Sequence, residues 1–234
     1  MNFVSTRLIA ALVLSSASIA AFAAPITPTY TTFSNLAGAT YGGSGIPTDP
    51  SAITTKGTLT LGLAATQRFV GPNLGNDGKG TYFANPGVAG TPARATWNFD
   101  FYLNDSAQNL NANGLTYKLF YDFNPGVGTD QSQLGVLYPI FFGSGQTIQN
   151  SENLSFGFLA SGSIVNSAPA MASFDPMANG EYSFALVAYR GDVEFARSAI
   201  LVDVGTVNVP EPASLALLGF GLAGLGFARR KLQK

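Results

Sequence analysis

Short segments of alternating apolar and polar residues recur along the middle of this chain. In residues 95–103 every second side chain is apolar, namely Trp97, Phe99, Phe101 and Leu103. Alternation with a period of two is typical of a β-strand with one buried face. Similar segments predict seven strands, at residues 56–63, 95–103, 115–122, 134–142, 154–159, 181–190 and 196–204.

Turn signals separate these segments. Asn113-Gly114 precedes the third predicted strand, and Arg190-Gly191-Asp192 lies between the last two, which predicts a C-terminal hairpin. Glycine-rich stretches at 38–45 and 71–80 indicate long surface loops. Amphipathic helical periodicity of useful length is missing between the two ends of the chain. We therefore expect an all-β fold, an antiparallel β-sandwich of either jelly-roll or immunoglobulin-like topology.

The composition limits the catalytic and metal-binding chemistry that this chain can carry out. The chain has 234 residues, 46% of them hydrophobic and 11% charged, and it contains neither His nor Cys. These numbers are unlike those of a disordered chain, and they exclude disulfides, Cys/His metal sites and a His-activated nucleophile. Nucleophile motifs of the G-x-S-x-G or S-x-x-K kind are also missing. The sequence thus favours a protein that is not an enzyme.

The charge distribution argues against nucleic-acid binding. Residues 24–209 contain seven basic and twelve acidic side chains, for a net charge of −5. A protein that binds nucleic acid would need a basic surface here to neutralise phosphates.

The first 23 residues have the organisation of a secretory signal peptide. A single arginine precedes an apolar run over residues 8–21, which ends in the small-residue cleavage pattern of Ala21 and Ala23. The run is shorter than the ~20 residues of a membrane span. We expect cleavage before Ala24 and export across the inner membrane.

The last 25 residues predict a short membrane anchor. They begin with a motif formed by Pro210, Glu211 and Pro212. An uncharged run over 213–228 follows and ends in a basic stop formed by Arg229, Arg230 and Lys231. This run predicts a single C-terminal transmembrane helix with its basic end in the cytoplasm and residues 24–212 outside.

This order of Pro-Glu-Pro motif, apolar helix and Arg-Arg-Lys end resembles the PEP-CTERM sorting signal of Gram-negative bacteria that make extracellular polysaccharide. The resemblance implies recognition by exosortase, a membrane-embedded cysteine protease that cleaves near the motif. It also implies a transient membrane anchor and a final location at the cell surface or in the extracellular matrix, with the polysaccharide as a candidate partner. A permanent C-terminal anchor is the alternative. The predicted parts are a signal peptide (1–23), an exported β-domain (24–209) and a sorting signal (210–234).

One loop offers candidate ligands for calcium. Asp122, Asn124 and Asp130 supply oxygen donors in a glycine-rich segment, as a hard cation requires. The segment departs from an EF-hand loop, because Gln133 stands where a bidentate Glu belongs. An ordinary turn in which these side chains bind backbone N–H groups is the alternative. We expect no other cofactor.

Two further site hypotheses concern carbohydrates. A sugar-stacking surface would need exposed aromatic side chains, and the candidates are Tyr41, Tyr82, Phe83, Tyr102 and Tyr138. A glycoside hydrolase would need a pair of carboxylates, and the candidates are Asp192 and Glu194, with Glu181 or Asp203 nearby. The alternatives are core packing for the aromatic residues and solvation for the acids. The leading expectation is a non-catalytic surface or matrix protein, followed by a carbohydrate- or calcium-binding module and then a secreted hydrolase.

Overall fold

A computed structural model describes residues 24–41, 50–68 and 74–205 of the chain. The structure is 48% strand and 7% helix, which confirms the all-β prediction. The predicted signal peptide and C-terminal helix lie outside the described residues. Within the described ranges, no helix is long and apolar enough to cross a membrane.

One sheet has five strands that are all paired antiparallel. Its order is β1-β2-β3-β8-β11. The strands are β1 (Thr32–Ser34), β2 (Ser51–Lys56), β3 (Leu59–Gln67), β8 (Trp97–Asp105) and β11 (Thr147–Glu152).

The other large sheet has seven strands, in the order β12-β10-β9-β13-β14-β5-β4. Its strands β14 and β5 run parallel, which departs from the predicted antiparallel fold. Parallel neighbours need a long connection instead of a hairpin, and here more than a hundred residues of chain separate the two strands. The strands are β4 (Gly75–Asn76), β5 (Thr81–Ala84), β9 (Thr116–Tyr121), β10 (Gly135–Leu137), β12 (Asn166–Ser167), β13 (Gly180–Arg190) and β14 (Val193–Val204). A separate small hairpin joins β6 (Val88–Ala89) to β7 (Arg94–Ala95).

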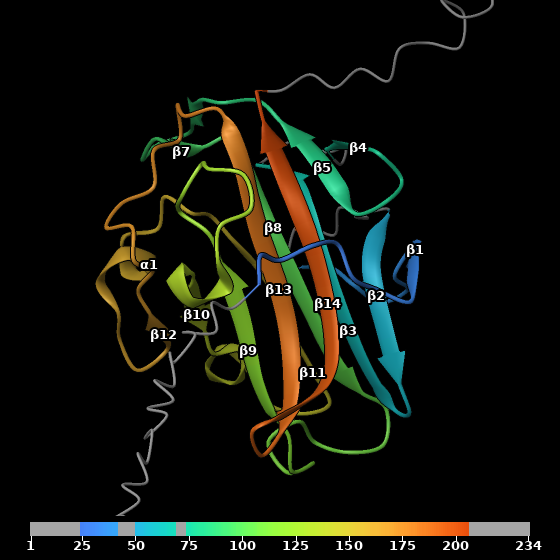
Figure 1. The fold of residues 1–234 in the computed structure, drawn as a ribbon. Helices are drawn as coiled ribbons and strands as arrows, with labels where there is room; N and C mark the ends of the chain where they lie inside the picture. Colours follow the sequence, from blue (N-terminus) through green and yellow to red (C-terminus); the bar gives the residue numbers. More distant parts are fainter. Residues whose placement is uncertain (1–23, 42–49, 69–73, 206–234) are drawn as a thin grey trace, which may run out of the picture.

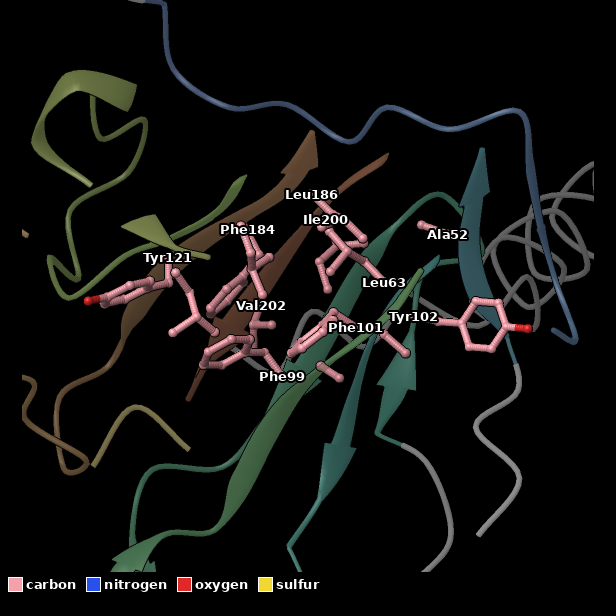
Figure 2. Close-up of a cluster of buried hydrophobic side chains, with 14 of the residues drawn as sticks. Ala52, Leu63, Phe99, Phe101, Tyr102, Tyr121, Phe184, Leu186, Ile200 and Val202 are labelled. Atoms are coloured by element: carbon pink, nitrogen blue, oxygen red, sulfur yellow. The ribbon is translucent and has the colours of Figure 1, made fainter. Parts of the chain in front are cut away.

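The main core lies between these two sheets (Figures 1 and 2). The predicted apolar face of β8 is confirmed, because Trp97, Phe99, Phe101 and Leu103 are buried in this core. The predicted exposure of the other face is wrong in the middle of the strand, where Asp100 and Tyr102 are also buried. β13 and β14 of the other sheet contribute Phe184, Leu186, Ile200 and Val202 (Figure 2). The two sheets therefore share one aromatic and aliphatic layer. The expected jelly-roll or immunoglobulin-like topology stays a prediction.

Three strand predictions need correction. Residues 154–159 form no strand but lead into the short helix α1 (Gly157–Ser161). The segment 134–142 is only partly a strand, because after β10 the chain enters the 3-10 helix η2 (Pro139–Phe142). Pro139 has no N–H group to continue the ladder. The segment 56–63 contains the turn between β2 and β3, with Gly57 at a φ of 63°.

Two of the predicted turns can be compared with the structure. The C-terminal hairpin is confirmed, because Arg190 pairs with Val193 across a turn in which Gly191 has a φ of 61°. Asn113-Gly114 stands at the end of a longer connection, and the two strands that it joins, β8 and β9, belong to different sheets. This connection carries the chain from one sheet to the other.

The first described residues form a strap over the outer face of the seven-stranded sheet (Figure 1). Ile26 is buried there in a second apolar cluster with Phe120, Leu134, Ala185, Val187 and Ala199. The N–H groups of Thr29 and Ala199 each donate to the other residue's carbonyl, at 3.1 and 2.7 Å. The chain then joins the other sheet as β1. Residues directly after the predicted cleavage site are therefore part of the fold.

Candidate binding site

The three candidate calcium ligands each serve a local turn. Asp122 is buried, and its carboxylate accepts hydrogen bonds from the Asn124 N–H at 2.8 Å and the Ser183 hydroxyl at 3.1 Å. Burial raises the pKa of Asp122 to about 6. The Asn124 side chain accepts from the N–H of Gly126, while Asp130 caps the 3-10 helix η1 (Gln131–Gln133).

These arrangements match the turn alternative for this loop. Among the residues that the structure describes, no group of three or more His, Cys, Asp or Glu side chains is placed to hold a metal ion. Calcium binding at Asp122, Asn124 and Asp130 stays a prediction.

Most of the candidate sugar-stacking residues are buried. Tyr41, Tyr82 and Tyr102 are each less than a tenth exposed, so their rings cannot form a surface platform. The Tyr82 hydroxyl donates to the Pro50 carbonyl at 2.6 Å, and the Tyr41 hydroxyl lies 2.8 Å from that of Ser51. Phe83 and Tyr138 are half-buried, and Tyr138 borders the groove described below.

The four candidate hydrolase carboxylates divide between the two ends of the β13–β14 hairpin. Asp192 and Glu194 lie at its turn, where Glu194 forms an ion pair with Arg197 at 2.7 Å. Glu181 and Asp203 are cross-strand neighbours near the opposite end. Glu194 and Asp203 are nine positions apart along β14, or roughly 30 Å of extended chain. The expected proximity of these two groups is therefore wrong, since glycosidase carboxylates lie within about 10 Å of each other.

Three buried acids, Asp100, Asp105 and Glu152, were missed by the sequence analysis. Asp100 in β8 is fully buried, and neither of its carboxylate oxygens has a hydrogen-bond partner of good geometry. Burial raises the pKa of Asp100 to about 7, although the nearby hydroxyls of Ser151 and Thr66 oppose the shift. Burial, with a further contribution from the charge of Asp100, also raises the pKa of Glu152 to about 7. The alternation pattern assigned Asp100 to a polar face and gave no sign that this face is covered.

A groove of about 520 Å³ lies beside the beginning of β9. The connection from β8 forms one wall, and η2 forms the other. Leu110 and Tyr117 are buried at its base, whereas Phe141 is 55% exposed at its rim. The remaining lining residues are Asn111, Leu115, Thr116, Lys118, Tyr138 and Ile140. The groove is thus mostly apolar, with one cationic side chain and no carboxylate in its lining.

The molecule described so far is a two-sheet β-protein whose last strand ends close to a distinctive C-terminal sequence. Residues 208–231 match the family described as PEP-CTERM protein-sorting motif. The chain therefore carries the sorting signal of an exported protein that is processed by exosortase and passes through a membrane-associated step at its C-terminus. Comparisons with curated proteins and with solved structures found no match.

Three sets of predicted residues lie outside the described part of the chain. The sorting motif (Pro210, Glu211 and Pro212) falls within the matched residues, as does the basic stop (Arg229, Arg230 and Lys231). The cleavage residues Ala21 and Ala23 just precede the described strap. Signal cleavage stays a prediction.

Proposed function

We propose that this protein is a non-catalytic structural component of the cell surface or extracellular matrix of a polysaccharide-producing Gram-negative bacterium. The observation that carries the proposal is the sorting motif at residues 208–231. It follows the last strand of the β-domain within a few residues. In the proposed sequence of events, the domain is exported, held at the membrane through its C-terminal segment and released by exosortase.

The chemistry of the domain supports a role without catalysis. The whole sequence has no His or Cys, so a nucleophile activated by imidazole is excluded. Carboxylates are then the main candidates for acid–base catalysis, and Glu181 and Asp203 lie at the opposite end of the hairpin from Asp192 and Glu194. A matrix component needs a stable body and contact surfaces, and the shared core and the groove supply both.

Deletion of the gene in the native host tests this proposal. Matrix composition and cell aggregation are measured, together with the location of the tagged protein in membrane, surface and matrix fractions. We expect an altered matrix and a protein found at the surface or in the matrix. An unaltered matrix, with the protein confined to the inner membrane, would contradict the proposal, as would turnover of a glycan by the purified protein.

A further inference from the structure

The groove follows a stretch of β-strand that has no neighbour on one side. β13 pairs with β9 along Thr116–Tyr121, but on the other side β10 reaches only residues 119–121. The chain turns away into η2 after β10, which leaves the edge of residues 116–118 without a strand partner in the described structure. An open edge presents backbone N–H and C=O groups that pair readily with an added strand.

The side chains around this edge define what kind of strand would fit. Leu115, Ile140 and Phe141 line the groove and are at least partly exposed, so they offer an apolar surface for one face of the added strand. The ammonium group of Lys118 lies 5.3 Å from the centre of the Tyr189 ring and has no carboxylate partner among the described residues. A short strand with apolar residues at alternate positions, followed by an acidic side chain, meets both conditions.

We infer that this groove binds residues 206–212 of a second copy of the same chain. This segment reads Thr-Val-Asn-Val-Pro-Glu-Pro, so that Val207 and Val209 alternate with polar residues. Its first four residues are enough to cover the three residues of the open edge, and Pro210 ends the pairing because it has no N–H group. Glu211 follows directly, and its charge is opposite to that of Lys118.

The geometry favours a second copy over the chain's own segment. Thr116 pairs with Tyr189 at one end of β13, whereas the last strand ends beside Gly180 at the other. The nine residue steps from Gly180 to Tyr189 span roughly 30 Å. Seven extended residues reach at most about 25 Å, so the segment cannot return to the groove of its own domain.

A contact of this kind joins different surfaces of two identical molecules. Such head-to-tail contacts continue from copy to copy and build an open chain unless a ring closes. The inference deepens the proposed function and rests on it, since a β-domain that links to the next one would form a polymer in the matrix.

Binding of a synthetic peptide tests the inference directly. The labelled peptide TVNVPEP is titrated with the full chain, purified in detergent and kept dilute, and fluorescence anisotropy reports binding. We expect saturable binding that weakens about tenfold or more when both valines are replaced by Asn, because two apolar side chains are then lost from the groove. Hydrogen exchange is expected to slow at the backbone amides of residues 116–118.

Exchanging the charges of Lys118 in the groove and Glu211 in the peptide tests whether the groove is the binding site. K118E should weaken binding of TVNVPEP by about threefold or more, and the E211K peptide should restore binding to this variant. The exposed Lys79 provides the matched control, so K79E should leave the affinity unchanged. No binding of the peptide, equal binding of the Asn-substituted peptide, or equal effects of K118E and K79E would overturn the inference. None of these outcomes would affect localisation or processing in the host, which test the proposed function separately.

Discussion

The rings of Phe99 and Phe184 stack with their centroids 4.8 Å apart and an interplanar angle of 24° (Figure 2). Phe99 comes from β8 of the five-stranded sheet and Phe184 from β13 of the seven-stranded sheet. Both side chains are fully buried, so this contact joins the two layers at the centre of the core.

Removal of the contact between Phe99 and Phe184 should destabilise the whole domain. We expect F99A to lower the free energy of unfolding by about 3–5 kcal/mol, because it removes a buried ring and leaves a cavity between the sheets. Urea unfolding followed by circular dichroism measures the change. V193A is the control, since Val193 is 72% exposed and its truncation should cost less than about 0.5 kcal/mol. A small loss in F99A would show that the two layers do not depend on this pair.

Stability should fall as the pH rises from about 4 to 7. In the unfolded chain Asp100 ionises near its ordinary pKa of about 3.9. In the folded protein, burial raises the pKa to about 7. Between these values the folded state holds the extra proton, so each step up in pH favours unfolding, and the full penalty is present above pH 7.

The substitution D100N isolates this effect. It should stabilise the protein by roughly 2–4 kcal/mol at pH 8 and change stability much less at pH 4, as urea unfolding at both pH values would show. D192N is the control, because Asp192 is exposed in a turn. A loss of stability in D100N at pH 8 would contradict the assignment and would instead indicate that the ionised carboxylate has a bound counter-charge.

Signal-peptide cleavage should produce a mature protein that begins at Ala24. N-terminal sequencing of the exported protein tests this, and intact Met1 in that form would contradict the prediction.

The strap should contribute to the stability of the mature domain, because Ile26, the third residue of the predicted mature chain, is buried. I26D should therefore lower stability by about 2–3 kcal/mol, whereas T27A at the neighbouring exposed position should have little effect.

Exosortase processing should remove the C-terminal segment. Mass spectrometry of the released protein should detect the β-domain but not residues 215–234. Replacement of the motif residues by P210A, E211A and P212A should leave the full-length chain in the membrane fraction, while the β-domain stays folded because its last strand ends at Val204. Release of the triple variant at the normal rate would contradict a role of this motif in processing.

The sequence alone determined the features that depend on local order. The period of two in residues 95–103 specified a strand and its buried face, and Gly191 between two apolar segments specified the C-terminal hairpin. The sorting motif could also be recognised from the sequence, because its parts follow one another along the chain. The polar strand β11 was missed, since its sequence Thr-Ile-Gln-Asn-Ser-Glu has no such alternation.

Only the tertiary structure decided which strands became neighbours and which polar positions became buried. Local periodicity says which side of a strand is apolar, but the pairing of β14 with β5 depends on contacts between distant parts of the chain. For the same reason Asp100, on the polar face of its strand, is fully buried, and Tyr41 and Tyr82 are not surface residues. The groove beside Thr116–Lys118 also exists because β10 is shorter than β9, and strand lengths across a sheet are set by packing instead of by the local pattern.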